Sequence, residues 1–167
     1  NKPGQGTFTI SNAKTGEVTF TPDPGWSGTA TIDYTITDTD GTIVHSTLTV
    51  TVPALVPPTA TADSASTPFG TPVSVNPPAN DIAHTFPLVP TSVKLCGPGD
   101  TAPACTQTTV TDATGTYVVN ADGTVTFTPC AGVNTPVMTP ACAGAFSGVA
   151  TIAYAIFDDH GHPASAL

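Results

Sequence analysis

Positive charge is nearly absent from this chain of 167 residues, which contains three lysines and no arginine. Twelve acidic side chains give it a formal net charge of −9. Binding to nucleic acid depends on lysine and arginine side chains that neutralise phosphates. Binding to an anionic membrane surface depends on the same side chains. We therefore expect no nucleic-acid partner and no attraction to an anionic membrane.

Long apolar runs are also missing. No stretch approaches the roughly 20 apolar residues that cross a bilayer, and no signal-peptide core is visible. We therefore expect no membrane insertion. The first residue is Asn1 rather than Met, as expected if a signal was removed or if the sequence is a piece of a longer chain.

Cysteine is scarce and lacks the spacing of a metal site. The four cysteines pair by proximity, Cys96 with Cys105 and Cys130 with Cys142, and neither pair is Cys-x-x-Cys or part of a zinc-ligand pattern. Two local disulfides are the simplest interpretation, and each would stabilise the fold by roughly 2.5–3 kcal/mol on the chain-entropy model. Disulfides imply an oxidising compartment, so we expect an extracellular or cell-surface location.

Alternating apolar and polar residues are abundant. Across residues 29–37, Ala30, Ile32, Tyr34 and Ile36 take every second position, which predicts a strand. No stretch has the 3.6-residue period of a helix. In the first third of the chain the same reasoning predicts further strands at 7–10, 17–21 and 43–52, with an Asp-Gly hairpin turn at 38–41.

One pattern occurs twice in the chain. The Gly-Thr-aromatic tripeptide at 6–8 returns at 115–117, the Val-Thr-Phe-Thr-Pro line at 18–22 returns at 125–129, and the aromatic-Ser-Gly-x-Ala-Thr-Ile-x-Tyr-x-Ile line at 26–36 returns at 146–156. A lag of about a hundred residues is the size of a domain rather than of a solenoid repeat. The repeat therefore predicts two copies of one β-module in tandem.

The division of the chain follows from this repeat. Residues 1–52 are predicted to be the C-terminal part of a first β-sandwich repeat, 53–58 a proline-rich linker, and 59–167 a second repeat with two disulfide loops. In the second repeat we predict strands at 59–63, 72–75, 91–95, 106–111, 116–119, 124–128 and 149–157, and a turn at 77–81.

The repeated line resembles the fibrillar repeats of bacterial surface adhesins, in particular the CshA-type fibril repeat and the wider group of immunoglobulin-like and cadherin-like tandem repeats. Residues 6–52 and 115–166 carry the resemblance, and 59–114 fit it in outline, with a Pro-Ala-Asn-Asp turn at 78–81. The chain departs from it through the cysteines and the insertion between Pro129 and Phe146. The resemblance implies an all-β fold of tandem immunoglobulin-like β-sandwich modules, the first incomplete.

The resemblance also implies a function. We expect a non-enzymatic structural or spacer module of an extracellular bacterial fibre or surface adhesin, whose partners are neighbouring repeats or identical subunits that could assemble by strand complementation. One alternative is an adhesion module that binds carbohydrate or a host or bacterial surface protein through its disulfide loops. A second is an accessory domain of a secreted hydrolase. No catalytic residue is predicted.

Two groups of acidic residues are candidate metal sites. Asp158, Asp159 and His160 lie close together, but they occupy the position of the hairpin turn at 38–41, where Asp before Gly needs no ligand. Calcium between modules is a property of cadherin-like arrays, which the resemblance brings to Asp38, Asp40 and Asp63. The dense acidic run of a calcium loop is missing, so we expect no cofactor and keep calcium as the weaker option.

The first repeat contains only the last four strands of a sandwich. Its apolar face would be exposed, which costs roughly 1.5–3 kcal/mol for each large apolar side chain, and its open sheet edges would recruit other strands. We therefore predict that residues 1–52 pack against chain from outside this stretch, whether covalently continuous or from another subunit. The predicted assembly face contains Ile32, Tyr34, Ile36, Leu48 and Val50.

Overall fold

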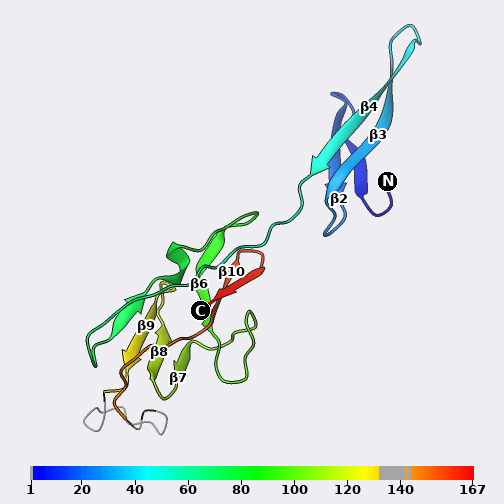
Figure 1. The fold of residues 1–167 in the computed structure, drawn as a ribbon. Helices are drawn as coiled ribbons and strands as arrows, with labels where there is room; N and C mark the ends of the chain where they lie inside the picture. The colour runs from blue at the N-terminus through cyan, green and yellow to red at the C-terminus, as the bar shows by residue number, and fades with distance from the viewer. Residues whose placement is uncertain (1, 132–141, 143) are drawn as a thin grey trace. The chain divides into compact units, whose positions relative to one another are not determined.

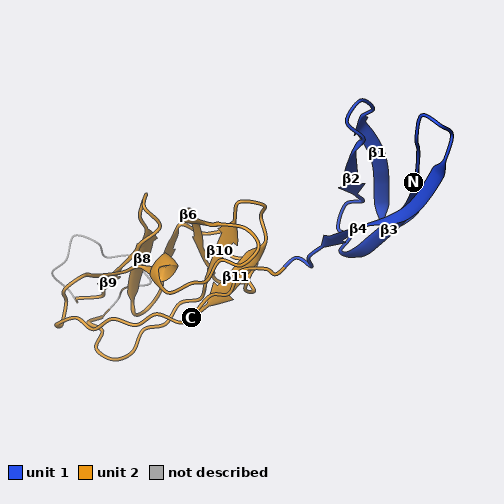
Figure 2. Cartoon of the chain, turned by 90° about the horizontal axis from the view of Figure 1, so that it is seen from above, with its two compact units in different colours: residues 1–55 blue, residues 56–167 orange. Residues whose placement is uncertain are grey.

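The computed structural model describes residues 2–131, 142 and 144–167. The chain is nearly all β and divides into two compact units, Asn1–Leu55 and Val56–Leu167 (Figure 2). The division falls inside the stretch expected to be a linker. Val56 already belongs to unit 2, because its N–H donates to the Thr85 hydroxyl at 2.8 Å and its carbonyl accepts from the Thr85 N–H at 3.2 Å.

Unit 1 consists of two β-hairpins (Figure 1). β1 (Gly6–Asn12) pairs with β2 (Glu17–Pro22), and β3 (Gly28–Thr37) pairs with β4 (Ile43–Val52). The four strands predicted here are confirmed. Each hairpin forms its own two-stranded sheet, and within the described residues no strand of one is paired with a strand of the other.

Unit 2 is a sandwich of two antiparallel sheets. One sheet has the strand order β5 (Val73–Val75), β9 (Val125–Pro129), β8 (Gly115–Val119), β7 (Thr109–Thr111), and the other has the order β11 (Pro163–Ala166), β10 (Tyr154–Asp158), β6 (Leu88–Leu95). Both sheets contribute to one apolar core, which contains Val93, Leu95, Val110, Tyr117, Val125, Tyr154, Ile156 and Ala164. The turn predicted at 77–81 contains a short 3₁₀ helix, Pro77–Ala79.

The sequence repeat is also a repeat of strand register. Gly6 lies opposite Pro22 and Phe8 opposite Phe20, just as Gly115 lies opposite Pro129 and Tyr117 opposite Phe127. Tyr34 lies opposite Ser46 and Ile36 opposite Val44, just as Tyr154 lies opposite Ala166 and Ile156 opposite Ala164. β1, β2, β3 and β4 therefore correspond to β8, β9, β10 and β11.

The strand predicted at 149–157 is wrong over its first five residues, because β10 begins only at Tyr154. In unit 1 the corresponding residues 29–33 pair with 47–51 of β4. In unit 2, Ala166 at the end of β11 lies opposite Tyr154, so 149–153 have no strand on that side. The strand predicted at 59–63 is likewise reduced to a single bridge between Thr59 and Ile82.

Two disulfides are present, Cys96–Cys105 and Cys130–Cys142. The first follows β6 and closes a loop without regular structure. Inside it, the Asp100 carboxylate accepts hydrogen bonds from the N–H groups of Gly97 at 3.1 Å and Thr106 at 3.3 Å. Most of the second loop, residues 132–141 and 143, lies outside the described residues.

Candidate functional site

The predicted assembly face of unit 1 lies on the β3–β4 hairpin. Ile32 is directly opposite Leu48, and Ala30 is directly opposite Val50. Directly opposite residues of an antiparallel pair point to the same side of the sheet, so Val44, opposite Ile36, joins this face. The face thus extends along the whole hairpin.

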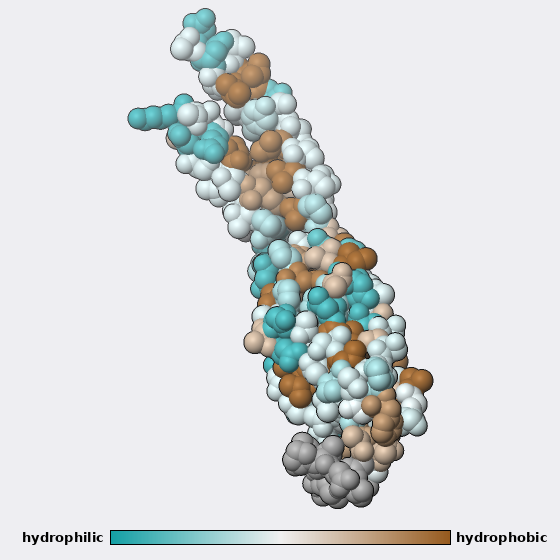
Figure 3. Space-filling model, turned by 90° about the vertical axis from the view of Figure 1, so that its left-hand side faces the viewer, coloured by the Kyte–Doolittle hydropathy of each residue, from teal (hydrophilic) through white to brown (hydrophobic). Residues whose placement is uncertain are grey.

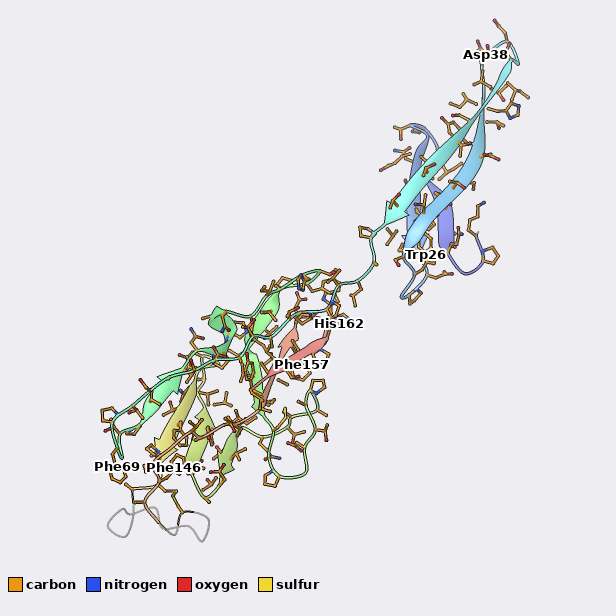
Figure 4. The ribbon with its side chains drawn as sticks, in the orientation of Figure 1. Trp26, Asp38, Phe69, Phe146, Phe157 and His162 are labelled. Carbon is orange, nitrogen blue, oxygen red and sulfur yellow. A yellow bond between two sulfur atoms is a disulfide. The ribbon has the colours of Figure 1, made fainter. Side chains whose placement is uncertain are left out.

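One end of this face is covered and the other is open. Ala30 is fully buried, and Ile32, Leu48 and Val50 are half-buried. Towards the Asp38 turn, which Figure 4 places at the tip of the hairpin, the side chains are exposed. At this open end, Tyr34 is 43% exposed, and Ile36 and Val44 are each 57% exposed.

The β1–β2 hairpin has a matching open end. Ile10 and Val18 are directly opposite each other, on the same side as Phe8 and Phe20, and they are 67% and 38% exposed. Figure 3 shows apolar side chains on the side of this unit that faces the viewer. We call the exposed residues Ile10, Val18, Tyr34, Ile36 and Val44 the open face.

Aromatic rings cover the other end of unit 1. The Phe8 and Phe20 ring centroids are 4.5 Å apart, and the Trp26 ring meets Phe20 edge-on at 5.6 Å. Gly6 lies against this cluster with φ of +147°, and a Cβ there would be 2.7 Å from the Phe20 ring. The glycine of the Gly-Thr-aromatic motif is therefore required for close packing.

The same arrangement recurs in unit 2. The Tyr117 and Phe127 centroids are 4.6 Å apart, and a Cβ at Gly115 would lie 2.9 Å from Phe127 Cζ. Sequence reasoning missed this role of Gly6 and Gly115, although the recurrence of glycine at the same position in both copies was a usable signal.

Unit 2 shows what covers the open face in a more complete module. Tyr154 and Ile156, the counterparts of Tyr34 and Ile36, are 3% and 0% exposed. β6 pairs with β10 along the edge that β3 leaves open. The Tyr154 hydroxyl donates to the Thr61 carbonyl oxygen at 3.1 Å or to Asp81 Oδ1 at 2.9 Å.

The environment of Tyr154 is acidic as well as buried. Burial, followed by the hydrogen bond and negative charge of Asp81, raises the pKa of the Tyr154 hydroxyl, so it stays a neutral donor. Burial and then the Asp81 charge raise the pKa of Asp63, although the neighbouring Tyr154 hydroxyl and Asn80 amide oppose this rise. Asp63 therefore contacts unit 2 side chains and lies on a different unit from Asp38 and Asp40.

The candidate metal ligands at the two hairpin tips are turn residues. Asp38 Oδ1 accepts the N–H groups of Asp40 at 3.0 Å and Thr42 at 2.8 Å. Asp158 Oδ1 accepts the N–H groups of His160 at 2.9 Å and His162 at 2.8 Å. The two turns are the same structure, which supports the turn interpretation of both aspartates.

The histidines after Asp158 are held by local contacts. His162 Nδ1 lies 2.7 Å from Asp158 Oδ2, and His160 Nδ1 lies 2.6 Å from Asp159 Oδ1. The Phe86 ring stacks on His160 with centroids 3.6 Å apart. Among the described residues, no three His, Cys, Asp or Glu side chains are grouped so that they could hold a metal ion.

Unit 2 has a shallow hollow lined by residues that flank the second disulfide loop in the sequence, Pro129 and Phe146 among them. A volume of about 170 Å³ is lined by Phe69, Phe146 and the Ser147-Gly148 turn, among others. Phe69 is 65% exposed, and Figure 4 shows it beside Phe146 at one end of the unit. The hollow therefore offers exposed aromatic surface on unit 2.

A family model described as a bacterial Ig domain matches residues 1–51. No curated protein and no solved structure matches the chain. Together with the strands and sheets above, the match is consistent with an all-β, immunoglobulin-like fold. Domains of this family are generally non-enzymatic and typically exposed at the bacterial surface, where they act as structural or adhesion modules.

Within the described residues, no helix is long and apolar enough to cross a membrane.

Proposed function

We propose that the chain is a non-enzymatic structural module of an extracellular bacterial fibre or surface adhesin, as in CshA-type fibril repeats. In this role unit 1 is completed by strands from outside residues 1–55. The observation that carries the proposal is the open face, which no strand of the described residues covers, although its counterpart in unit 2 is covered.

The edges of the strands in unit 1 also support this proposal. In unit 2, β9 pairs with β5, β8 pairs with β7, and β10 pairs with β6. Their counterparts β2 and β3 have no strand at the equivalent edge in the described part of unit 1, and β1 has no strand there beyond the bridge between Lys2 and Gly6. Open edges with an apolar face beside them are favourable sites for strand addition. We therefore infer that three strands would complete unit 1 and that they correspond to β5, β6 and β7 of unit 2.

The energy available for this association is large relative to the stability of a small domain. Full burial of one Val or Ile side chain contributes roughly 1.5–3 kcal/mol, and Ile10, Ile36 and Val44 are each more than half exposed. Single domains are stable by only about 5–15 kcal/mol. Covering the open face would therefore change the stability of unit 1 substantially, which suits a module that is stable only within a larger assembly.

We propose no cofactor for this role and keep calcium as the weaker option. The carboxylates of Asp38 and Asp158 accept turn N–H groups in the same way in both units, so neither turn needs calcium to hold it.

The second candidate function is adhesion through the hollow beside Phe69 and Phe146. Exposed aromatic rings supply flat apolar surface for a carbohydrate or a protein partner. A glycan array and a pull-down with the 167-residue chain, repeated with Phe69→Ala, test this candidate. Binding that Phe69→Ala abolishes would favour adhesion over a purely structural role.

Light scattering on the exact 167-residue chain tests the structural proposal. We expect the mass to rise with concentration, because the open face and edges associate. Ile36→Asp should suppress this association, whereas Thr35→Asp, on the opposite side of β3, should not. The proposal is wrong if the chain is a monodisperse monomer and Trp26, the only tryptophan and a probe of unit 1, reports cooperative unfolding.

A further inference from the structure

The first residues of unit 2, residues 56–63, connect the linker to the sandwich without forming a strand. Figure 1 draws this segment as coil. The bridge between Thr59 and Ile82 is its one strand-like pairing within the described structure. We call residues 56–63 the strap.

The strap is fastened mainly by one loop, residues 80–85. The Thr59 N–H donates to the Ile82 carbonyl at 3.0 Å, and the Thr59 carbonyl accepts the Ile82 N–H at 2.8 Å. Two residues further on, the Thr61 N–H donates to Asp81 Oδ1 at 2.8 Å. The first residue of the strap is bonded to the same loop. Hydrogen bonds to a single loop, several of them to side chains, thus take the place of a strand ladder.

The strap adds little apolar surface to the core. Pro58 is buried and Ala60 is half-buried, whereas Val56 is 48% exposed. The strands beneath contribute larger side chains, such as Leu95 at 1% and Ile156 at 0% exposure. Because the burial of apolar area is the main source of attachment, the strap is held much less firmly than β6 and β10.

Closure of the strap also has an electrostatic cost. Asp63 Oδ2, at the end of the strap, and Asp81 Oδ2, in the loop, are both buried and have no hydrogen-bond partner among the described residues. A buried carboxylate oxygen without a partner loses free energy that it regains when water reaches it. Detachment of the strap would hydrate both oxygens and separate two like charges.

We propose that the strap detaches from unit 2 as one piece while the sandwich stays folded. Few buried apolar contacts and hydrogen bonds near the surface are the properties of segments that open at low free energy. Detachment releases residues 56–63 as free chain, which spans roughly 26 Å when extended. In a fibre module this reserve would lengthen the chain under tension without unfolding the sandwich. That consequence rests on the proposed function, whereas the detachment itself does not.

Native-state hydrogen exchange on the full 167-residue chain tests the detachment. The amides of Thr59 and Thr61 report the strap, and the Leu95 N–H, which donates to the Gln107 carbonyl at 2.7 Å, reports the sandwich. We expect protection of the strap amides to be at least about tenfold lower than that of Leu95 and nearly independent of low urea concentrations, because detachment exposes little surface. Equal protection with equal urea dependence would show that the strap opens only when the sandwich unfolds, and would overturn the proposal.

Two adjacent prolines supply a matched pair of variants. Pro58 is buried, whereas Pro57 is exposed. Pro58→Ser should lower the protection of Thr59 and Thr61 by about tenfold, because it removes the main apolar anchor of the strap, and should leave Leu95 unchanged. Pro57→Ser should change neither. An equal loss of protection at Leu95 in Pro58→Ser would mean that strap and sandwich open together.

A third variant should act in the opposite direction. Asp63→Asn removes one of the two like charges, and its amide can donate to the unpartnered Asp81 oxygen. We expect the protection of Thr59 and Thr61 to rise several-fold while that of Leu95 stays the same. Unchanged or lower protection of the strap amides would contradict the proposal. These readouts lie in unit 2, so they are independent of whether unit 1 associates in light scattering.

Discussion

Tyr34 and Tyr154 occupy the same position of the repeat, and the same register places Ser46 opposite the first and Ala166 opposite the second. The first is 43% exposed and the second is 3% exposed. The difference arises from the strands around them, since β6 lies beside β10 and no strand lies at that edge of β3 in the described residues. Two copies of one sequence pattern thus show a β-sandwich in two states of completion.

The first prediction uses this pair of tyrosines. Tyr154→Phe should destabilise unit 2 by about 1–2 kcal/mol, because the buried hydroxyl that donates to Thr61 or Asp81 is lost. Tyr34→Phe should change the stability of unit 1 by less than about 0.5 kcal/mol, as is usual for exposed sites. Urea unfolding followed by circular dichroism for unit 2 and by Trp26 fluorescence for unit 1 measures both. Equal effects of the two substitutions would contradict the assigned contacts.

Much of the fold follows from period-two patterns and turn chemistry. The alternation of Ala30, Ile32, Tyr34 and Ile36 predicts β3, and the Asp-Gly turn predicts its hairpin with β4. The repeat predicts that the second copy has the same register. In each of these cases the prediction rests on residues close together in the sequence or on the internal repeat.

The errors arise where long-range partners decide the structure. Residues 149–153 have the same alternation as 29–33, but they form no strand, and no strand of the described residues pairs with them. Alternating apolar and polar residues indicate which side of a strand would be buried. They do not indicate whether another strand pairs with it. The contact between Asp81 and Tyr154 could not be predicted either, since it joins residues 73 positions apart.

The second prediction concerns the glycine beneath the aromatic pair. Gly115→Ala should destabilise unit 2 by about 1–3 kcal/mol, because the added Cβ would be forced against the Phe127 ring and the neighbouring strand. Gly144→Ala is the matched control, since a Cβ there meets nothing within 4 Å. Thermal unfolding of the two variants measures the difference, and a Gly115→Ala chain as stable as the control would refute the packing role.

The third prediction concerns pH. Burial and the nearby Asp81 charge raise the pKa of Asp63 in the folded state. Because the folded state binds the Asp63 proton more tightly, protonation of Asp63 stabilises the fold at pH values below its pKa in the unfolded chain, which is near 4. This stabilisation is lost as the pH rises through the pKa of Asp63 in the folded chain. Asp63→Asn should therefore stabilise unit 2 at neutral pH and remove this loss.

Asp112 should behave in the opposite way. Burial alone would raise its pKa, but hydrogen bonds from the Thr114 hydroxyl and from the N–H groups of Thr114 and Gly115 lower it overall. Its contribution to stability is present above the unfolded pKa and is lost as the pH falls through the folded value. Asp112→Asn should thus destabilise unit 2 at neutral pH. Urea unfolding across pH 3–7 compares the two variants, and the same sign for both would contradict this account.

The last prediction compares two alanines at one position of the repeat. Ala30 is completely buried in a paired strand, so Ala30→Leu should overpack unit 1 and destabilise it by about 1–3 kcal/mol. Ala150 lines a cavity of unit 2, so Ala150→Leu has room and should be neutral or stabilising, as a cavity-filling change. Trp26 fluorescence reports the first substitution, and circular dichroism reports the second. If Ala150→Leu were as destabilising as Ala30→Leu, the space beside residues 149–152 would have to be closed in solution.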